Sequence, residues 1–210
     1  DGTDDYVDLS GSLTQDTSHT IAMWIKTTAT NSPFLFAWGG SGINNYGGLS
    51  LWGSRIRYYS GNGTPGVLSV SGSNNVNDGN WHHVAIARDN SGNVSLYVDG
   101  QLDGSGAISK YVSSVTNVSL GAAFANGIYQ GQYSGNIDDL NYWSRALTAS
   151  EIQELICKNT KGTDLIAAFT FSEAAGNTVS FNQQSGVING TLMNMDAVSS
   201  WVPFGSPVLT

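Results

Sequence analysis

Apolar and polar residues alternate in short runs along most of the chain, and clusters of Gly, Asn, Asp and Ser separate the runs. Ile21, Met23 and Ile25 fall on one face of such a run and their neighbours on the other, which is the two-residue period of a half-buried strand. Because the runs are short and closely spaced, they predict an antiparallel β-sandwich or barrel. The predicted strands cover residues 20–26, 49–52, 55–59, 82–88, 94–99, 115–121, 135–143 and 165–171.

One segment departs from the strand pattern. Thr148 with Glu151 three residues later forms a capping box, the sequence signature of a helix N-terminus. Ile152, Leu155 and Ile156 follow at the spacing of an apolar helix face. We therefore expect one short helix that begins after Thr148.

No shift in composition marks a domain boundary, so residues 1–210 are predicted to form a single domain. Residues 160–210 are interpreted as C-terminal strands and a tail that close the sandwich, because Trp201 and Phe204 would otherwise be exposed. The alternative interpretation, that this segment is the start of a neighbouring repeat, stays open.

Composition agrees with an all-β fold and narrows the possible partners. Only 11% of residues are charged while 26 are Gly, which excludes a coiled coil or a Lys/Glu-rich bundle. The net charge is −8, and Arg55 and Arg57 are the only close pair of basic residues. We therefore expect no nucleic-acid partner and no attraction to anionic membranes. There is no apolar run near 18 residues, so no membrane insertion is expected either.

The single cysteine does not place the protein in the cytosol. The chain begins at Asp1 without Met or a basic-then-apolar leader, and we interpret it as a mature chain or an excised domain. Cys157 is the only cysteine, so neither an internal disulfide nor a Cys-based zinc site is possible. Low charge and many Ser, Thr, Asn and Gly suit a secreted or cell-surface protein that folds without disulfides.

Three segments, residues 1–7 with the strand around Trp24, residues 81–100 and residues 135–152, carry a resemblance to a known family. They resemble the laminin-G/pentraxin-like branch of the concanavalin A-like lectin and glucanase superfamily, in the family's order. The resemblance implies a jelly-roll sandwich of two curved antiparallel sheets with one short helix. It also implies a calcium ion, since many relatives bind one.

The carboxylates of the chain do not form the pattern expected of a glycosidase. A glycosidase needs two carboxylates flanking the scissile bond, yet the only glutamates are Glu151, Glu154 and Glu173, of which two lie on the predicted helix. Asp138 and Asp139 are neighbours on a predicted strand and would point to opposite faces. We expect no catalytic residues and no enzyme activity. A diverged polysaccharide lyase or glycoside hydrolase is the less favoured alternative.

Acidic residues supply the candidate metal ligands. Calcium prefers six to eight oxygen ligands from carboxylates and carbonyls, often gathered at loop ends. One group of aspartates crowds the N-terminal strand and another lies in a strand that related folds place near it. The predicted calcium ligands are Asp1, Asp4, Asp5, Asp138 and Asp139.

Aromatic and basic residues supply the candidate ligand site. Arg55, Arg57 and Tyr59 share one face of the strand at residues 55–59, with Ile56 and Tyr58 on the core side. Flat rings can stack on the apolar faces of sugars, and guanidinium and amide groups can orient hydroxyl or acid groups. The predicted ligand-binding residues are Trp38, Tyr46, Trp52, Arg55, Arg57 and Tyr59, with a second wall from Asn126, Tyr129 and Gln130 in the loop at residues 125–133.

These observations together predict a non-catalytic carbohydrate-binding module or lectin-like adhesion domain. It would belong to a larger secreted or cell-surface protein, with other domains as neighbours and a polysaccharide or glycan as ligand. The alternative function is a protein- or peptide-binding adhesion domain, whose partner would be a cell-surface protein.

Overall fold

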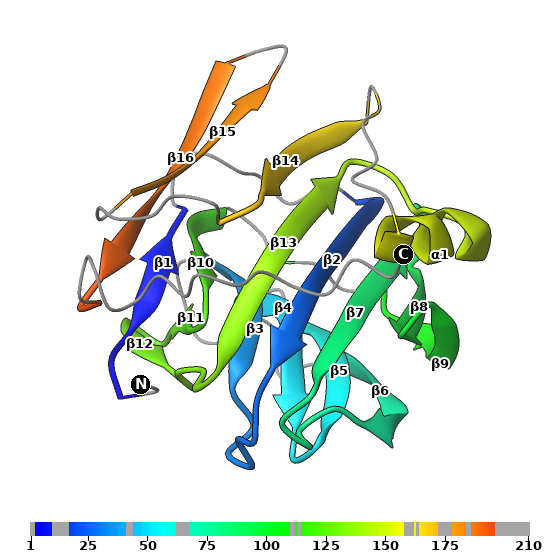
Figure 1. Ribbon diagram of the computed structural model, residues 1–210, viewed down its shortest axis with the longest axis horizontal. Helices are drawn as coiled ribbons and strands as arrows, with labels where there is room; N and C mark the ends of the chain where they lie inside the picture. The colour runs from blue at the N-terminus through cyan, green and yellow to red at the C-terminus, as the bar shows by residue number, and fades with distance from the viewer. Residues whose placement is uncertain are drawn as a thin grey trace.

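Two antiparallel sheets pack face to face in the computed structural model of the protein, with the six-stranded sheet in front of the eight-stranded one in Figure 1. The structure describes residues 3–9, 17–40, 44–61, 68–109, 112, 115–157, 162, 164–171, 178–183 and 186–195. This arrangement confirms the predicted jelly-roll sandwich. Each predicted strand overlaps an observed one, because period-two alternation reports directly on which face of a strand is buried.

The larger sheet holds eight strands and the smaller sheet six. In spatial order, the larger sheet consists of β15 (Thr178–Gln183), β16 (Gly186–Met193), β1 (Tyr6–Asp8), β10 (Val115–Leu120), β3 (Phe34–Gly40), β4 (Tyr46–Trp52), β5 (Arg55–Ser60) and β6 (Leu68–Asn75). The smaller sheet consists of β14 (Leu165–Phe169), β13 (Asn136–Trp143), β2 (His19–Lys26), β7 (Trp81–Arg88), β8 (Asn93–Val98) and β9 (Gln101–Ala107). A separate short hairpin is formed by β11 (Ala123–Ala125) and β12 (Ile128–Gln130).

The core lies between the two sheets. Its largest fully buried side chains include Trp38 and Tyr58 from the larger sheet and Tyr142 from the smaller one. The rings of Trp38 and Tyr142 meet edge to face with centroids 6.0 Å apart, a favoured geometry for aromatic pairs. Burial of these rings, together with the other apolar side chains of the core, stabilises the packing of the two sheets.

Strands from the C-terminal part of the chain belong to both sheets. β14 pairs with β13 in the smaller sheet, and β16 pairs with β1 in the larger one. The pairing of β16 places Leu192 opposite Val7, so the two ends of the described chain lie side by side. Trp201 and Phe204, on which the interpretation of the tail depended, lie outside the described residues.

The single helix of the described residues, α1 (Ala149–Cys157), begins where the capping box predicts it. Thr148 Oγ1 accepts a hydrogen bond from the Glu151 backbone N–H at 3.3 Å, and the Glu151 carboxylate accepts one from the Thr148 N–H at 2.8 Å. Ile152 packs with Ala22 and Trp143 on the outer face of the smaller sheet. The helix therefore covers the side of the sandwich that faces away from the larger sheet (Figure 1).

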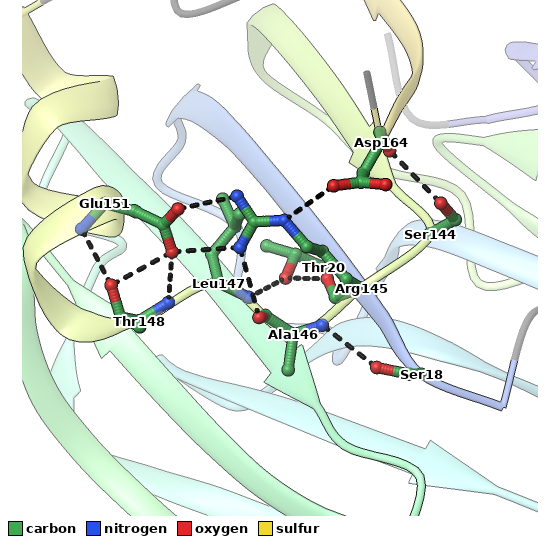
Figure 2. A network of polar contacts seen from close by, with 9 residues as sticks. All are labelled: Ser18, Thr20, Ser144, Arg145, Ala146, Leu147, Thr148, Glu151 and Asp164. Atoms are coloured by element: carbon green, nitrogen blue, oxygen red, sulfur yellow. Dashed lines mark hydrogen bonds and ion pairs between the residues drawn. The ribbon is translucent and has the colours of Figure 1, made fainter. Parts of the chain in front are cut away.

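A polar network holds the start of α1 against β2 and the loop after β13 (Figure 2). Arg145 donates to both carboxylate oxygens of Glu151, at 3.0 and 2.6 Å, and to Asp164 at 3.1 Å. Thr20 Oγ1 accepts from the Leu147 N–H and donates to the Arg145 carbonyl. The hydrogen bonds from Arg145 and from the Thr148 backbone lower the pKa of Glu151 from 4.5 to about 2.

Replacing Glu151 with glutamine is expected to lower the free energy of unfolding by about 1 kcal/mol at pH 7, the usual scale of a lost cap. The folded-state pKa is depressed, so this stabilisation is present above about pH 4.5 and is lost as the pH falls toward about 2. Urea unfolding at pH 7 and at pH 2.5 measures this difference. The free energies of unfolding of the unmutated protein and of Glu151→Gln should become similar at pH 2.5. Glu154→Gln, at an exposed position on the same helix, is the control. The prediction would be contradicted if Glu151→Gln were less stable than the unmutated protein by the same amount at both pH values.

No helix among the described residues is both long and apolar enough to cross a membrane.

Candidate functional site

The outer face of the larger sheet, at β4, β5 and β6, carries the predicted aromatic and basic residues. Ile56 and Tyr58 are fully buried on the core side, which confirms the predicted facing of β5. Arg57 and Tyr59 point the other way, and their guanidinium and ring lie 5.3 Å apart. The Cα partner of Tyr59 on β4 is Gly48, where a side chain would come within 2.0 Å of the Phe36 carbonyl, so the glycine lets β3 and β4 lie close together beneath this face.

A pocket of about 170 Å³ opens on this face, lined by Phe34, Tyr46, Arg57, Tyr59 and Ser69. Among the lining residues, Tyr59 contacts two other rings. Phe34 and Tyr46 both meet its ring edge to face, with centroids 5.5 and 5.6 Å away. The pocket therefore combines aromatic walls with one cation and three hydroxyl groups.

Trp52 adjoins the pocket at the end of β4. The residue is 59% exposed, and the Arg57 guanidinium lies 4.2 Å from the centroid of its ring. This cation–π contact holds Arg57 in place without neutralising its charge. The structure therefore brings Tyr46, Trp52, Arg57 and Tyr59 together, as the sequence analysis expected.

Two polar atoms at the pocket are buried and have no hydrogen-bond partner: the hydroxyl of Tyr59 and Nε of Arg57. Burial raises the pKa of Tyr59 well above its ordinary value, so the phenol stays protonated and can donate. Burial also lowers the pKa of Arg57, an effect that the two neighbouring tyrosines oppose. Arginine nevertheless stays charged near neutral pH.

Trp38 does not belong to this site, and the prediction that its ring contacts a ligand is wrong. It lies in β3, fully buried, with its ring against Phe36 at 5.0 Å and His19 at 4.9 Å. The following Gly39 continues the strand and does not open a loop. A side chain at Gly39 would come within 2.4 Å of the Phe124 carbonyl, so the glycine lets the β11–β12 hairpin lie close over β3.

The predicted second wall is part of this hairpin. Asn126 is exposed at its tip with φ +55°, and the Tyr129 ring stacks on Tyr6 of β1 with centroids 4.0 Å apart. None of Asn126, Tyr129 and Gln130 lines the pocket. The base of the hairpin does reach it, because the Phe34 N–H donates to the Gly131 carbonyl at 2.8 Å. A role for these three residues in ligand binding stays a prediction.

Sequence reasoning missed Phe34 and Ser69, which also line the pocket. Ser69 could have been found, because Ser69 and Ser71 alternate with Val70 in the pattern of a half-buried strand. Arg55, which was predicted, is exposed on β5 and lies outside the lining. Its contribution to binding stays a prediction.

The predicted calcium ligands are dispersed where the structure describes them. Asp4 is exposed before β1, Asp5 is half-buried, and Asp138 is buried in β13. Asp139 adopts φ +46° at an irregular point of β13, where the pairing with β2 shifts between Asp138 and Asn141. The strand is therefore not regular there, so strict alternation of the two aspartates does not apply.

Within the described part of the chain, no three or more His, Cys, Asp and Glu side chains gather so that they could hold a metal ion. Asp1 lies outside the described residues. The calcium ion stays a prediction, and no step of ligand binding is assigned to it.

The pocket lining is suited to recognition of a ligand. Its lining offers ring faces, hydroxyl groups and a guanidinium, and it includes no carboxylate or imidazole that could act as a general acid or base. Such a lining can cover an apolar surface while donating several hydrogen bonds.

Comparison with known proteins adds a family match. The family model described as "Concanavalin A-like lectin/glucanases superfamily" matches residues 1–153. Neuronal pentraxin-1 from Homo sapiens is 28% identical over 170 residues, which covers 74% of this chain and 37% of the pentraxin. The chain thus spans only about a third of that relative's length.

Solved structures share the fold over most of the chain. The CBM40 of Ruminococcus gnavus IT-sialidase, bound to alpha2,3 sialyllactose, aligns with a TM-score of 0.62 at 18% identity, over 74% of this chain and 95% of that one. A SAP-like pentraxin from Limulus polyphemus aligns with a TM-score of 0.58 at 19% identity, over 91% and 96% of the two chains. At such identities the likeness concerns the fold alone.

Proposed function

The chain belongs to the concanavalin A-like lectin/glucanase superfamily, as a laminin-G- and pentraxin-like domain, and from this premise we propose that it is a non-catalytic carbohydrate-binding module. Glycan binds on the outer face of the larger sheet, at the pocket between Tyr46, Arg57 and Tyr59. The module belongs to a larger secreted or cell-surface protein and presents this face to a polysaccharide or glycoconjugate.

The observation that carries the proposal is the exposed Trp52 ring beside a pocket with unsatisfied donors. A tryptophan that is 59% exposed is unusual on a sheet whose other aromatic residues are packed. Stacking on a sugar would cover it at small entropic cost, while Arg57 and the Tyr59 hydroxyl bind the polar edge of the same sugar. The fold neighbour from Ruminococcus gnavus, seen with sialyllactose, supports a glycan over a peptide.

The same proposal holds that the module binds glycan and does not cleave it. Hydrolysis by acid–base catalysis needs two carboxylates near the scissile bond, and the pocket lining supplies none. Incubation with candidate glycans should therefore release no new reducing ends and no unsaturated products. Either product would favour a diverged hydrolase or lyase.

Trp52→Ala is expected to weaken glycan binding about tenfold or more, because stacking and the seating of Arg57 are both lost. The melting temperature should change little, since the ring is largely exposed. A glycan array followed by calorimetric titration of the best ligand measures the first effect, and a melting curve measures the second.

Leu102→Ala is the matched control, because Leu102 is 61% exposed but lies on β9 of the smaller sheet. It should leave binding unchanged. An array that stays blank for the unmutated protein, together with capture of a cell-surface protein, would favour the alternative function of a protein-binding adhesion domain. Equal losses in both variants would place the ligand elsewhere.

The calcium ion predicted from the acidic residues is tested in the same titration with excess chelator. Loss of affinity would support an ion that takes part in binding or holds a loop in place. Unchanged affinity would show that the pocket works without one.

A further inference from the structure

Among the described arginines, the side chains of Arg55 and Arg57 have no acidic or carbonyl partner, and of these two only Arg57 is half-buried. Arg145 is paired with Glu151 and Asp164, and Arg88 donates to the carbonyls of Thr17 and Ile108. Within the described residues, the Arg57 guanidinium takes part in no hydrogen bond or ion pair, only in contacts with the rings of Trp52 and Tyr59. A half-buried cation without a counter-charge is costly unless a ligand supplies one.

The Tyr59 hydroxyl adds a second unsatisfied group at the same place. Tyr59 is only 2% exposed, and its hydroxyl is buried without a partner. It lies beside Arg57 in the lining of the pocket. Buried polar groups are normally hydrogen-bonded, so two orphan donors in one pocket point to an acceptor that comes from outside the protein.

Building on the proposed glycan-binding function, we infer that the pocket binds the carboxylate of an acidic sugar through the Arg57 guanidinium and the Tyr59 hydroxyl. The planar guanidinium matches the two oxygens of a carboxylate and can bind both. The phenol can donate only one bond, which complements the lone pairs that Arg57 leaves free. The Phe34 and Tyr46 rings flank the apolar part of the sugar.

The dimensions and charge of the protein restrict the ligand further. A volume of about 170 Å³ is below the roughly 300–1,000 Å³ of pockets that enclose a drug-sized molecule, so it accommodates one sugar unit. The chain carries a net charge of −8, which disfavours long polyanions. The preferred ligand is therefore a single acidic residue at the end of a short glycan.

Two kinds of sugar offer this chemistry, sialic acids and uronic acids. Calorimetric titration with 3′-sialyllactose and with trigalacturonic acid distinguishes them. The methyl ester of each removes the charge and keeps the rest of the sugar, so it isolates the role of the carboxylate. We expect one of the two acids to bind at least tenfold more tightly than its own ester, the scale of a charge-assisted hydrogen bond.

Substitutions test whether the pocket is responsible. Arg57→Met should remove the preference for the acidic sugar over its methyl ester. The affinity for the acidic sugar should fall tenfold or more. Tyr59→Phe removes only the hydroxyl and should lower the affinity for the acidic sugar about three- to tenfold. Lys26→Met is the control, since Lys26 is an exposed cation on β2 of the smaller sheet and lies outside the pocket. It should leave the acid-to-ester ratio unchanged, and melting curves verify that each variant is folded.

The outcomes separate the inference from the function on which it rests. Binding of neutral and acidic glycans with equal affinity, or an acid preference that survives Arg57→Met, would overturn the carboxylate assignment and leave a glycan-binding module. Failure of the unmutated protein to bind any glycan on an array would overturn the proposed function itself.

Discussion

Replacing Trp38 with alanine is expected to lower the free energy of unfolding by about 3–5 kcal/mol, the usual cost of deleting a large ring from a packed core. Trp38 is fully buried between the sheets, against His19, Phe36 and Tyr142. The cavity left behind would be lined by these rings, which belong to strands of both sheets and cannot collapse without moving a strand.

Urea unfolding of Trp38→Ala and Trp52→Ala, two replacements of the same residue type on the same sheet, measures the effect. Trp52→Ala should change the free energy of unfolding by less than about 1 kcal/mol, because only a surface cation–π contact is lost. A Trp38 variant as stable as the unmutated protein would show that the ring is not part of the core. Any binding defect of Trp38→Ala should track its unfolded fraction.

Asp103→Ala is expected to lower the free energy of unfolding by about 1–3 kcal/mol, the scale of lost hydrogen bonds to a charged group. Asp103 is buried on β9, at the edge of the smaller sheet, and its carboxylate accepts hydrogen bonds from groups of β6, at the edge of the larger one. The donors are the Ser73 N–H at 3.1 Å, the Ser73 hydroxyl at 3.0 Å and the Asn74 N–H at 2.9 Å. Removing the acceptor leaves the two backbone N–H groups without this partner, whereas the Ser73 hydroxyl can still donate to the Asp103 carbonyl at 3.3 Å. Ser73 and Asn74 are exposed, so water can reach part of the network.

Thermal and urea unfolding of Asp103→Ala, with Ser105→Ala as an exposed control on the same strand, tests this role. Asp103→Asn keeps an acceptor oxygen of similar size and should recover part of the lost stability. A loss below about 0.5 kcal/mol in Asp103→Ala would mean that water replaces the carboxylate and that the two edges do not depend on it.

Local patterns predicted the parts of the fold that depend on local physics. The facing of Ile56 and Tyr58 against Arg57 and Tyr59 follows from strand geometry alone, and the structure agrees. The start of α1 follows equally from Thr148, because a capping box is satisfied within four residues.

The pocket could be predicted only in part because its lining depends on irregular pairing. Phe36 and Trp38 face the core, and strict alternation would place Phe34 beside them. The pairing of β3 with β4 shifts between Phe34 and Phe36, and Phe34 instead meets Tyr59 on the outer face. Such a bulge has no clear local signal in one sequence.

The error on Trp38 has a similar origin. Two glycines after an aromatic residue favour a turn when only local preferences are considered. Here Gly39 continues a strand because the hairpin of β11 and β12, more than 80 positions further along the chain, packs directly against it. That contact is tertiary, and no pattern within the segment reports it.

The placement of α1 also fixes where the protein can be attached to a surface. Cys157, the only cysteine of the chain, is exposed at the end of this helix. The helix covers the outer face of the smaller sheet, whereas the pocket opens on the outer face of the larger sheet. Coupling the thiol to a maleimide-coated chip would therefore orient every molecule alike, with Arg57 and Trp52 turned toward the solution.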